Sequence, residues 1–229
     1  MKVFLDPGHG GKDPGALGNG LREKDIALSV TLKVGEILKR HNIEVIYSRT
    51  TDVFLELSER TNLANKANAD IFVSIHCNAA ENINAKGVET FSYPNSTKGT
   101  ALAKCIQDSI IQSKVYTSDR GIKTANFAVL RQSNMPSALV ELAFITNVDD
   151  GKILKDRQDE LALAVAKGIL NYLGIKYIEK TKELDCSPWA VEAMEWGMKN
   201  NLTDGTNPKE PISLERFITI LYRYGKALE

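Results

Sequence analysis

The first 177 residues alternate short β-forming runs with stretches of helical periodicity. Ile26, Val30 and Val34 recur at helical spacing and predict a helix over about 24–40. Further helices are predicted over 57–67 and 99–113, and a last one runs from about 161 to 172 before Gly174. Strands are predicted over 2–5, 44–47, 71–75, 88–93, 128–130 and 138–143. This alternation predicts an α/β fold, in which a mixed, mainly parallel sheet of about six strands carries helices on both faces.

Two of the predicted helices have defined buried stripes. The helix over 57–67 is expected to turn Leu63, Ala64 and Ala67 inward. The helix over 99–113 is expected to place Cys105 on its buried stripe.

The remaining residues form a second, smaller pattern. The stretch 178–185 is rich in charges and has no apolar period, so it is predicted to be a linker after a domain over 1–177. Residues 186–229 are predicted to form a small helical C-terminal domain. One helix is expected to start at Ser187-Pro188, and a turn-rich segment follows it over 201–211. Ser213 is expected to cap a second helix, with these apolar side chains inward: Phe217, Ile218, Leu221 and Tyr222.

Composition excludes several classes of protein. The chain has 229 residues, and its 29 basic side chains equal its 29 acidic ones, so no bulk charge points to nucleic acid or to a membrane surface as a partner. The chain has no N-terminal signal pattern and no apolar run of about eighteen residues. Three scattered cysteines are too few for a disulfide framework or a four-thiolate zinc site.

Two of the three histidines lie where predicted strands end. His9 follows the first strand within "DPGHGGKDPGA", and His76 follows the run 71–75 directly. Ligands of open α/β sheets bind outside the carboxyl ends of the strands, so both imidazoles are candidate ligands. Either one taken singly could be an ordinary loop histidine. The third, His41, follows a helix end, where its charge suits the helix dipole, and we assign it no chemistry.

Two glutamates complete a candidate site. Glu23 precedes the first long helix, where it could bind a metal or merely favour the helix dipole. Glu141 interrupts the apolar run "PSALVELAFITN". Burying an unpaired carboxylate is costly, so Glu141 needs a cation or a raised pKa unless it faces outward from a half-exposed strand. Two imidazoles and a carboxylate suit a catalytic zinc ion, and a further carboxylate can move protons.

Five segments in order resemble zinc-dependent N-acetylmuramoyl-L-alanine amidases of the Amidase_3 type: "DPGHGGKDPGA", "LREKDIAL", "SERTNLANKANADIFVSIHCNA", "GVETF" and "PSALVELAFITN". The resemblance covers about residues 2–177. It implies that one zinc ion is bound by His9, Glu23 and His76, and that Glu141 is the catalytic acid and base. The implied reaction is hydrolysis of the amide between N-acetylmuramic acid and L-alanine in bacterial peptidoglycan, which lyses the cell wall.

Other features refine this expectation. Only residues 79–86 separate "SIHCN" from "GVETF", which leaves no room for the inhibitory helix that some family members insert there. The site is therefore expected to be constitutively open. Asn78 could support His76 or contact substrate, and Arg131 is a candidate for binding a substrate carboxylate.

The tail over 186–229 resembles a single S-layer-homology repeat. Such repeats usually bind wall polymers in groups of three, so one copy could bind a secondary wall polymer or associate with a second copy of the chain. Without a signal peptide, a phage-type endolysin that stays cytoplasmic until its release to the wall is expected. A secreted autolysin that lacks its signal is the alternative.

Two other functions compete with this reading. One is a zinc peptidase that cuts within the peptide stem. The other is a non-catalytic wall-binding protein, for which a missing site residue would be expected, although all four positions hold the residue types that chemistry requires.

Overall fold

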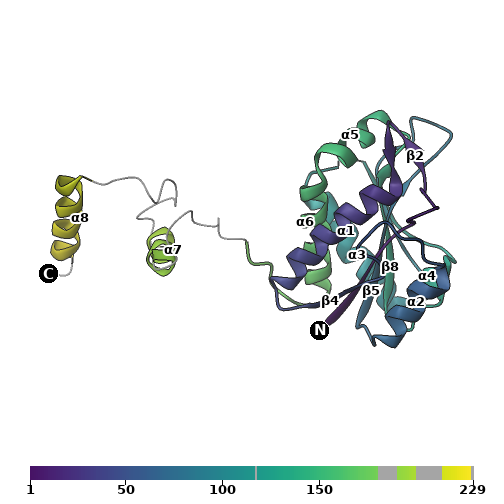
Figure 1. Ribbon diagram of the computed structural model, residues 1–229, viewed down its shortest axis with the longest axis horizontal. Coiled ribbons are helices and arrows are strands. Elements are labelled where there is room, and N and C mark those ends of the chain that lie inside the picture. The colour runs from purple at the N-terminus through teal and green to yellow at the C-terminus, as the bar shows by residue number, and fades with distance from the viewer. Residues whose placement is uncertain (117, 180–189, 200–212, 228–229) are drawn as a thin grey trace. The chain divides into compact units, whose positions relative to one another are not determined.

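The computed structural model describes residues 1–116, 118–179, 190–199 and 213–227. The chain divides into two units, Met1–Tyr177 and Ile178–Glu229, and each is described by itself (Figure 1).

A six-stranded sheet forms the centre of the first unit, in the order β4-β1-β5-β8-β6-β7. Its strands are β1 (Lys2–Pro7), β4 (Glu44–Tyr47), β5 (Ile71–Asn78), β6 (Val88–Ser92), β7 (Asp119–Thr124) and β8 (Ser137–Phe144). β4, β1, β5 and β8 run parallel, whereas β6 is antiparallel to β8 and parallel to β7. The predicted mixed, mainly parallel sheet is therefore confirmed. A small hairpin of β2 (Leu17–Gly18) and β3 (Leu21–Arg22) lies outside this sheet.

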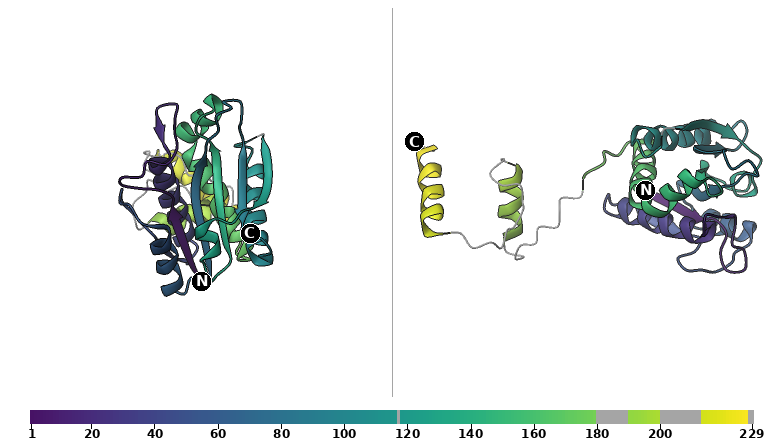
Figure 2. Two further views of the ribbon diagram at one scale, coloured as in Figure 1. Left: turned by 90° about the vertical axis from the view of Figure 1, so that its right-hand side faces the viewer. Right: turned by 90° about the horizontal axis from the view of Figure 1, so that it is seen from above.

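Helices cover both faces of the sheet (Figures 1 and 2). On one face lie α1 (Glu23–Lys39), α3 (Thr97–Gln112) and α6 (Gln158–Tyr172), and on the other lie α2 (Leu57–Lys66) and α4 (Ala128–Arg131). The alternation of side chains along each strand explains the two cores. In β5, for example, Ile71 and Val73 face the larger core under α1, α3 and α6, while Phe72 faces the smaller core under α2 and α4.

The structure corrects several predicted elements. Residues 128–130 form helix α4, and the sixth strand is β7, whose sequence "DRGIKT" is mostly exposed. An edge strand needs few apolar side chains, so hydrophobicity pointed to the wrong segment. β5 continues to Asn78, which places His76 inside the strand. Helix α5 (Val148–Asp156) follows β8 and was not predicted.

Two helix faces also differ from expectation. Leu63 of α2 is exposed and Ala67 is half-buried, whereas Arg60, Thr61 and Ala64 form the buried stripe. Arg60 belongs to the buried stripe because its guanidinium donates hydrogen bonds to the backbone carbonyls of Pro7 and His9. Cys105 of α3 is half-buried.

The second unit contains α7 (Val191–Lys199) and α8 (Leu214–Ala227). α8 begins directly after Ser213, but the four apolar side chains predicted to face inward are 46–64% exposed. Among the described residues of this unit, none covers these four side chains. Most of the predicted linker, the helix start at 187–188 and the turn-rich segment 201–211 lie outside the described residues. Among the helices that are described, none has the length and apolar character needed to cross a membrane.

Candidate metal centre

The glycine-rich loop after β1 brings His9 to the carboxyl end of the sheet. His9 itself has a left-handed backbone, with φ 58°. At two positions only glycine fits, because a side chain would collide with a neighbouring residue. A Cβ on Gly8 would lie 2.3 Å from the His76 ring, and one on Gly15 would lie 2.6 Å from Glu23 Oε2. The small residues of this loop therefore let three functional side chains approach one another.

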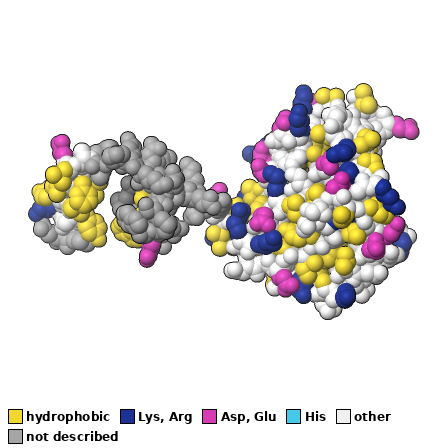
Figure 3. All heavy atoms as spheres, viewed as in Figure 1, with side chains coloured by type: hydrophobic (Ala, Val, Ile, Leu, Met, Phe, Trp, Pro, Cys, Tyr) yellow, Lys and Arg dark blue, Asp and Glu magenta, His cyan; other side chains and the backbone are white. Residues whose placement is uncertain are grey.

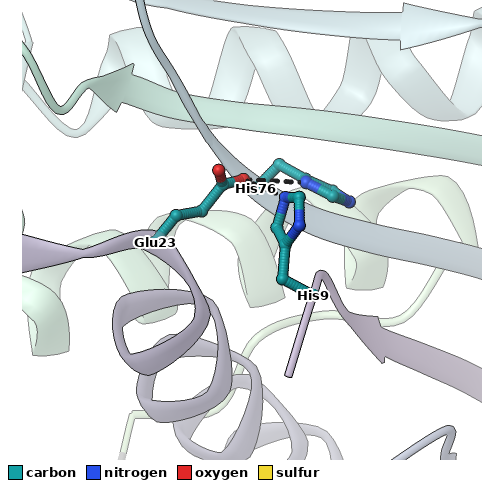
Figure 4. A group of neighbouring side chains, drawn as sticks. All are labelled: His9, Glu23 and His76. Atoms are coloured by element: carbon teal, nitrogen blue, oxygen red, sulfur yellow. Dashed lines mark hydrogen bonds and ion pairs between the residues drawn. The ribbon is translucent and has the colours of Figure 1, made fainter. Parts of the chain in front are cut away.

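Glu23, the first residue of α1, is almost completely buried. Its carboxylate points toward both histidines, whose rings lie next to each other (Figure 4). Its Oε1 is 3.0 Å from His9 Nε2 and 2.8 Å from His76 Nδ1. The backbone N–H of Cys77 also donates to Oε1, and that of Ala16 donates to Oε2. These bonds fix the carboxylate in the position where both imidazoles meet it.

The three side chains form a group that could hold a metal ion. One ligand atom from each lies within 4.8 Å of the others, and the described residues contain no second group of this kind. Two imidazole nitrogens and one carboxylate oxygen suit zinc and leave coordination positions for water and substrate. The Asp13 carboxylate lies 2.8 Å from His9 Nδ1, which directs His9 Nε2 toward the group.

Without a metal ion, the group behaves as a compact ion-pair cluster. Burial opposes protonation of His9, but hydrogen bonds and charge attraction from Glu23 and Asp13 outweigh it and raise the pKa of His9 to about 9. Burial disfavours the Glu23 anion as well, yet hydrogen bonds from His76 and His9 hold the pKa of Glu23 far below its usual range. In the metal-free chain the Glu23 anion is therefore paired with a protonated His9, and His9 must release that proton before its imidazole can bind a metal ion.

Glu141 lies beside this group on the neighbouring strand β8. It is in register with His76, so both side chains project from the same face of the sheet. Val140 and Leu142 point to the opposite face and are completely buried. Glu141 Oε2 is buried without a hydrogen-bond partner. Burial, partly opposed by the charge of His76 and reinforced by Glu23, raises the pKa of Glu141 to about 7.

A cavity of about 600 Å³ opens over these side chains. Its lining includes all four candidate residues and Asn78, together with apolar residues on two sides: Phe54, Leu55 and Leu57 before and at the start of α2, and Phe127, Ala128 and Val129 at α4. Arg131 lies elsewhere on α4, and its guanidinium donates to the backbone and side-chain oxygens of Asn126. The buried His41 ring bonds to the Ile37 carbonyl and stacks on Tyr177.

Two buried arginines form hydrogen bonds with the glycine-rich loop after β1, here called the metal loop because it carries His9. Sequence reasoning missed both. Arg60 donates to the carbonyls of Pro7 and His9, and Arg49 donates to those of Pro7, Gly8 and Lys24. Arg49 thus joins the loop that carries His9 to the first turn of the helix that carries Glu23. The available signal was the position of Arg60 on the buried stripe of α2, where a charged residue needs a partner.

Comparison with known proteins gives a consistent family. Residues 3–171 match the Amidase_3 family model, which describes N-acetylmuramoyl-L-alanine amidases. The chain is 42% identical over 175 residues to the N-acetylmuramoyl-L-alanine amidase LytC of Bacillus subtilis, covering 74% of this chain and 35% of LytC. It is 41% identical over 182 residues to the endolysin of Bacillus phage SPP1, covering 76% of this chain and 66% of the endolysin. The chain therefore spans about a third of the first relative and two thirds of the second.

Solved structures agree with these relatives. The amidase AmiC2 of Nostoc punctiforme superimposes with a TM-score of 0.73 at 42% identity, covering 76% of this chain and 97% of AmiC2. The catalytic domain of CwlV from Bacillus (Paenibacillus) polymyxa gives a TM-score of 0.72 at 36% identity, covering 76% of this chain and 99% of that domain. With most of its first unit matched in both sequence and fold, the chain belongs to the Amidase_3 family of N-acetylmuramoyl-L-alanine amidases.

Proposed function

We propose that this chain hydrolyses the amide between the lactyl group of N-acetylmuramic acid and L-alanine in bacterial peptidoglycan, with one zinc ion as cofactor. The observation that carries the proposal is the convergence of His9, Glu23 and His76 beside Glu141, whose buried oxygen lacks a partner, in one cavity. Family membership supports the choice of this amide bond over the other bonds of the wall.

The four residues divide the chemistry between them. When bound by His9, Glu23 and His76, zinc would polarise the scissile carbonyl and make a water molecule easier to deprotonate. Glu141 faces the same cavity and would accept a proton from the attacking water. It would then deliver that proton to the leaving nitrogen of L-alanine. A pKa near neutrality suits a group that must both accept and donate a proton.

The cavity is built for access by a polymer. Residues 79–87 are the whole connection between β5 and β6, and no helix lies in it. We therefore propose that the site is open without a separate activating step. Asn78 lines the cavity and is proposed to contact substrate, whereas Arg131 would reach substrate only after leaving Asn126.

The metal requirement can be tested with the purified chain and a suspension of bacterial cell walls. The untreated enzyme should clear the suspension, treatment with a chelator should stop clearing, and added zinc should restore it. His76→Ala should lose both bound zinc, measured by elemental analysis, and activity. His41→Gln is the matched control, because His41 lies outside the cavity, and it should keep both. Full activity of a zinc-free protein would refute the metal mechanism.

For residues 186–229 we propose contact with a secondary wall polymer or with a second copy of the chain. The exposed apolar side chains of α8 support a role in association, since such a face is stabilised when another surface covers it. Cosedimentation with purified walls, compared between the full chain and residues 1–177, tests the first partner. Sedimentation equilibrium of the full chain tests the second.

A further inference from the structure

A row of ionisable side chains crosses the sheet away from the candidate metal centre. Glu141 of β8 is in register with His76 of β5 on one side and with Glu89 of β6 on the other. Residues paired in this way project from the same face of a sheet. Glu89 therefore lies one strand beyond Glu141, on the face that carries the cavity.

Glu89 is a buried carboxylate with three partners. Its Oε1 accepts a hydrogen bond of 2.7 Å from Asn78 Nδ2, and Asn78 lines the cavity. Its Oε2 accepts one of 2.7 Å from Arg120 Nε and another from Lys123 Nζ, both on the edge strand β7. Burial disfavours the anion, but these cations outweigh it and lower the pKa of Glu89. Glu89 is therefore a fixed negative charge.

A β-bulge puts both cations on the same face. Val88 pairs with Asp119 and Thr90 with Ile122, so Glu89 alone opposes both Arg120 and Gly121. Gly121 has φ +75°, a conformation that glycine adopts readily. In a regular strand, residues 120 and 123 would point to opposite faces.

The charges in this cluster do not cancel. Arg120 and Lys123 bring two positive charges to one carboxylate, which leaves a surplus of one. Their side chains are 36% and 39% exposed, whereas that of Glu89 is 5% exposed. The neighbouring Asp119 carboxylate bonds to Gln107 of α3, which covers the other face of the sheet. The surplus charge is therefore available to a ligand.

Arg120 and Lys123, the cation pair, lie beside the cavity at a distance from Glu141 that a short peptide can span. Lys123 lies over the ring of Phe91, which contacts the ring of Phe127 in the cavity wall. From β8 to β7 is two strand spacings, or about 10 Å. An extended peptide covers about 3.3–3.6 Å per residue, so this span is about three residues from the bond that is cut.

We propose that Arg120 and Lys123 bind a free carboxylate on the second or third residue of the peptide stem. The stem then crosses β8, β6 and β7 from the metal centre to the edge of the sheet. Glu89 positions both cations and orients Asn78. This inference rests on the proposed amidase function and adds to it a determinant of substrate choice.

The test uses two synthetic N-acetylmuramoyl tripeptides that differ only in whether the carboxyl groups of stem residues two and three are free or converted to carboxamides. The zinc-loaded full chain should prefer the free-carboxyl probe by about 10-fold in kcat/KM, mainly through KM. Arg120→Gln and Lys123→Gln should each bring that ratio toward one. Lys123→Arg, which keeps the charge, should retain it.

Lys104→Gln is the matched control, because Lys104 is an exposed cation of α3, and both its ratio and its rates should equal those of the unchanged chain. Thermal unfolding of every variant checks that the fold is intact. An equal ratio in the unchanged chain and in both glutamine variants would overturn the inference. If the unchanged chain cleaves neither probe, the proposed amidase function fails instead.

Discussion

Glu141 occupies an environment that an ordinary surface carboxylate would not tolerate. One of its oxygens is buried without a partner, and the fixed charges of Glu23 and Glu89 lie nearby. A group with no stabilising partner in the folded chain is a weak contributor to stability and a good candidate for catalysis. This burial, together with the nearby negative charges, raises the pKa of Glu141.

Replacing this carboxyl group separates chemistry from metal binding. Glu141→Gln should lower kcat on a soluble muramoyl peptide by about 10²–10⁴-fold, because the amide cannot accept the proton of water. Zinc content and melting temperature should stay close to those of the unchanged chain, since Glu141 is not among the three proposed ligands. Glu160→Gln, an exposed change in α6, is the control. Retained activity in Glu141→Gln would assign the base to another residue.

Asp13 is expected to act through His9. Asp13→Ala removes the carboxylate 2.8 Å from His9 Nδ1, so the imidazole loses the bond that orients it. Zinc affinity, measured by competition with a chelator, should fall about 10- to 100-fold. Asp108→Ala, which removes an exposed carboxylate of α3, should have no effect. Equal affinities for the two variants would show that Asp13 does not position the ligand.

The sequence identified side chains whose chemistry is unusual for their position. His9, His76 and Glu141 follow or interrupt β-forming runs, and the structure brings them with Glu23 around one cavity. Their catalytic roles stay predictions. Arg49, Arg60 and Glu89 escaped notice because each acts through partners that only the folded chain brings close. Asp13 escaped notice because it lies in a glycine-rich loop, although His9 is only four residues away. The Asp6, Pro7 and His9 partners of Arg60 lie more than fifty residues from it in sequence.

At the scale of elements, α2 is fastened to the loop after β1 by Arg60. The guanidinium bonds to the completely buried Asp6 carboxylate and to the carbonyls of Pro7 and His9. Two serine hydroxyls, from Ser48 and Ser74, are the other side-chain partners of Asp6. Arg60 is therefore the cation that permits burial of Asp6.

Removing that cation should loosen the metal loop. Arg60→Ala is expected to lower the free energy of unfolding by about 3–5 kcal/mol, because Asp6 would stay buried without its ion-pair partner. Denaturant unfolding of the metal-free chain measures the loss. Arg22→Ala, which breaks only an exposed pair with Asp25, should cost less than about 1 kcal/mol. Comparable losses in the two variants would contradict the proposed anchoring.

The elements themselves were predictable where hydrophobicity is periodic. The helix that became α1 and the strands β4 and β8 were expected within a residue or two of their observed bounds, because each has one or two clearly apolar faces. β7 was missed because its bulge and exposed edge leave no alternating pattern. α4 was mistaken for a strand because four residues are too few to show helical periodicity.

At the scale of the whole molecule, basic and acidic groups are mixed over the surface, whereas the candidate catalytic side chains of the first unit gather at its cavity. Figure 3 shows basic and acidic side chains interspersed over the visible face of the first unit. No broad field of one sign dominates that face. Recognition of substrate is therefore expected to depend on the cavity and the residues beside it.

The response of stability to pH should depend on the metal. In the metal-free chain, the pKa of His9 is raised from 6.5 to about 9, so its ion pair with Glu23 stabilises the fold fully below pH 6.5 and is lost as the pH rises through about 9. Metal binding instead requires deprotonated imidazoles and strengthens as the pH rises. The gap in melting temperature between zinc-loaded and metal-free chains should therefore widen from pH 6 to pH 9. A gap that stays constant or narrows would contradict this.

The most direct test of the central claim is mass spectrometry of purified peptidoglycan digested by the zinc-loaded chain. The proposed function predicts that new free amino groups appear on the L-alanine of the stem and that the glycan strands keep their length. The Glu141→Gln chain, treated in parallel, should release peptides at least about 10²-fold more slowly. New amino groups on any other stem residue would contradict the assignment and indicate a peptidase that cuts within the stem.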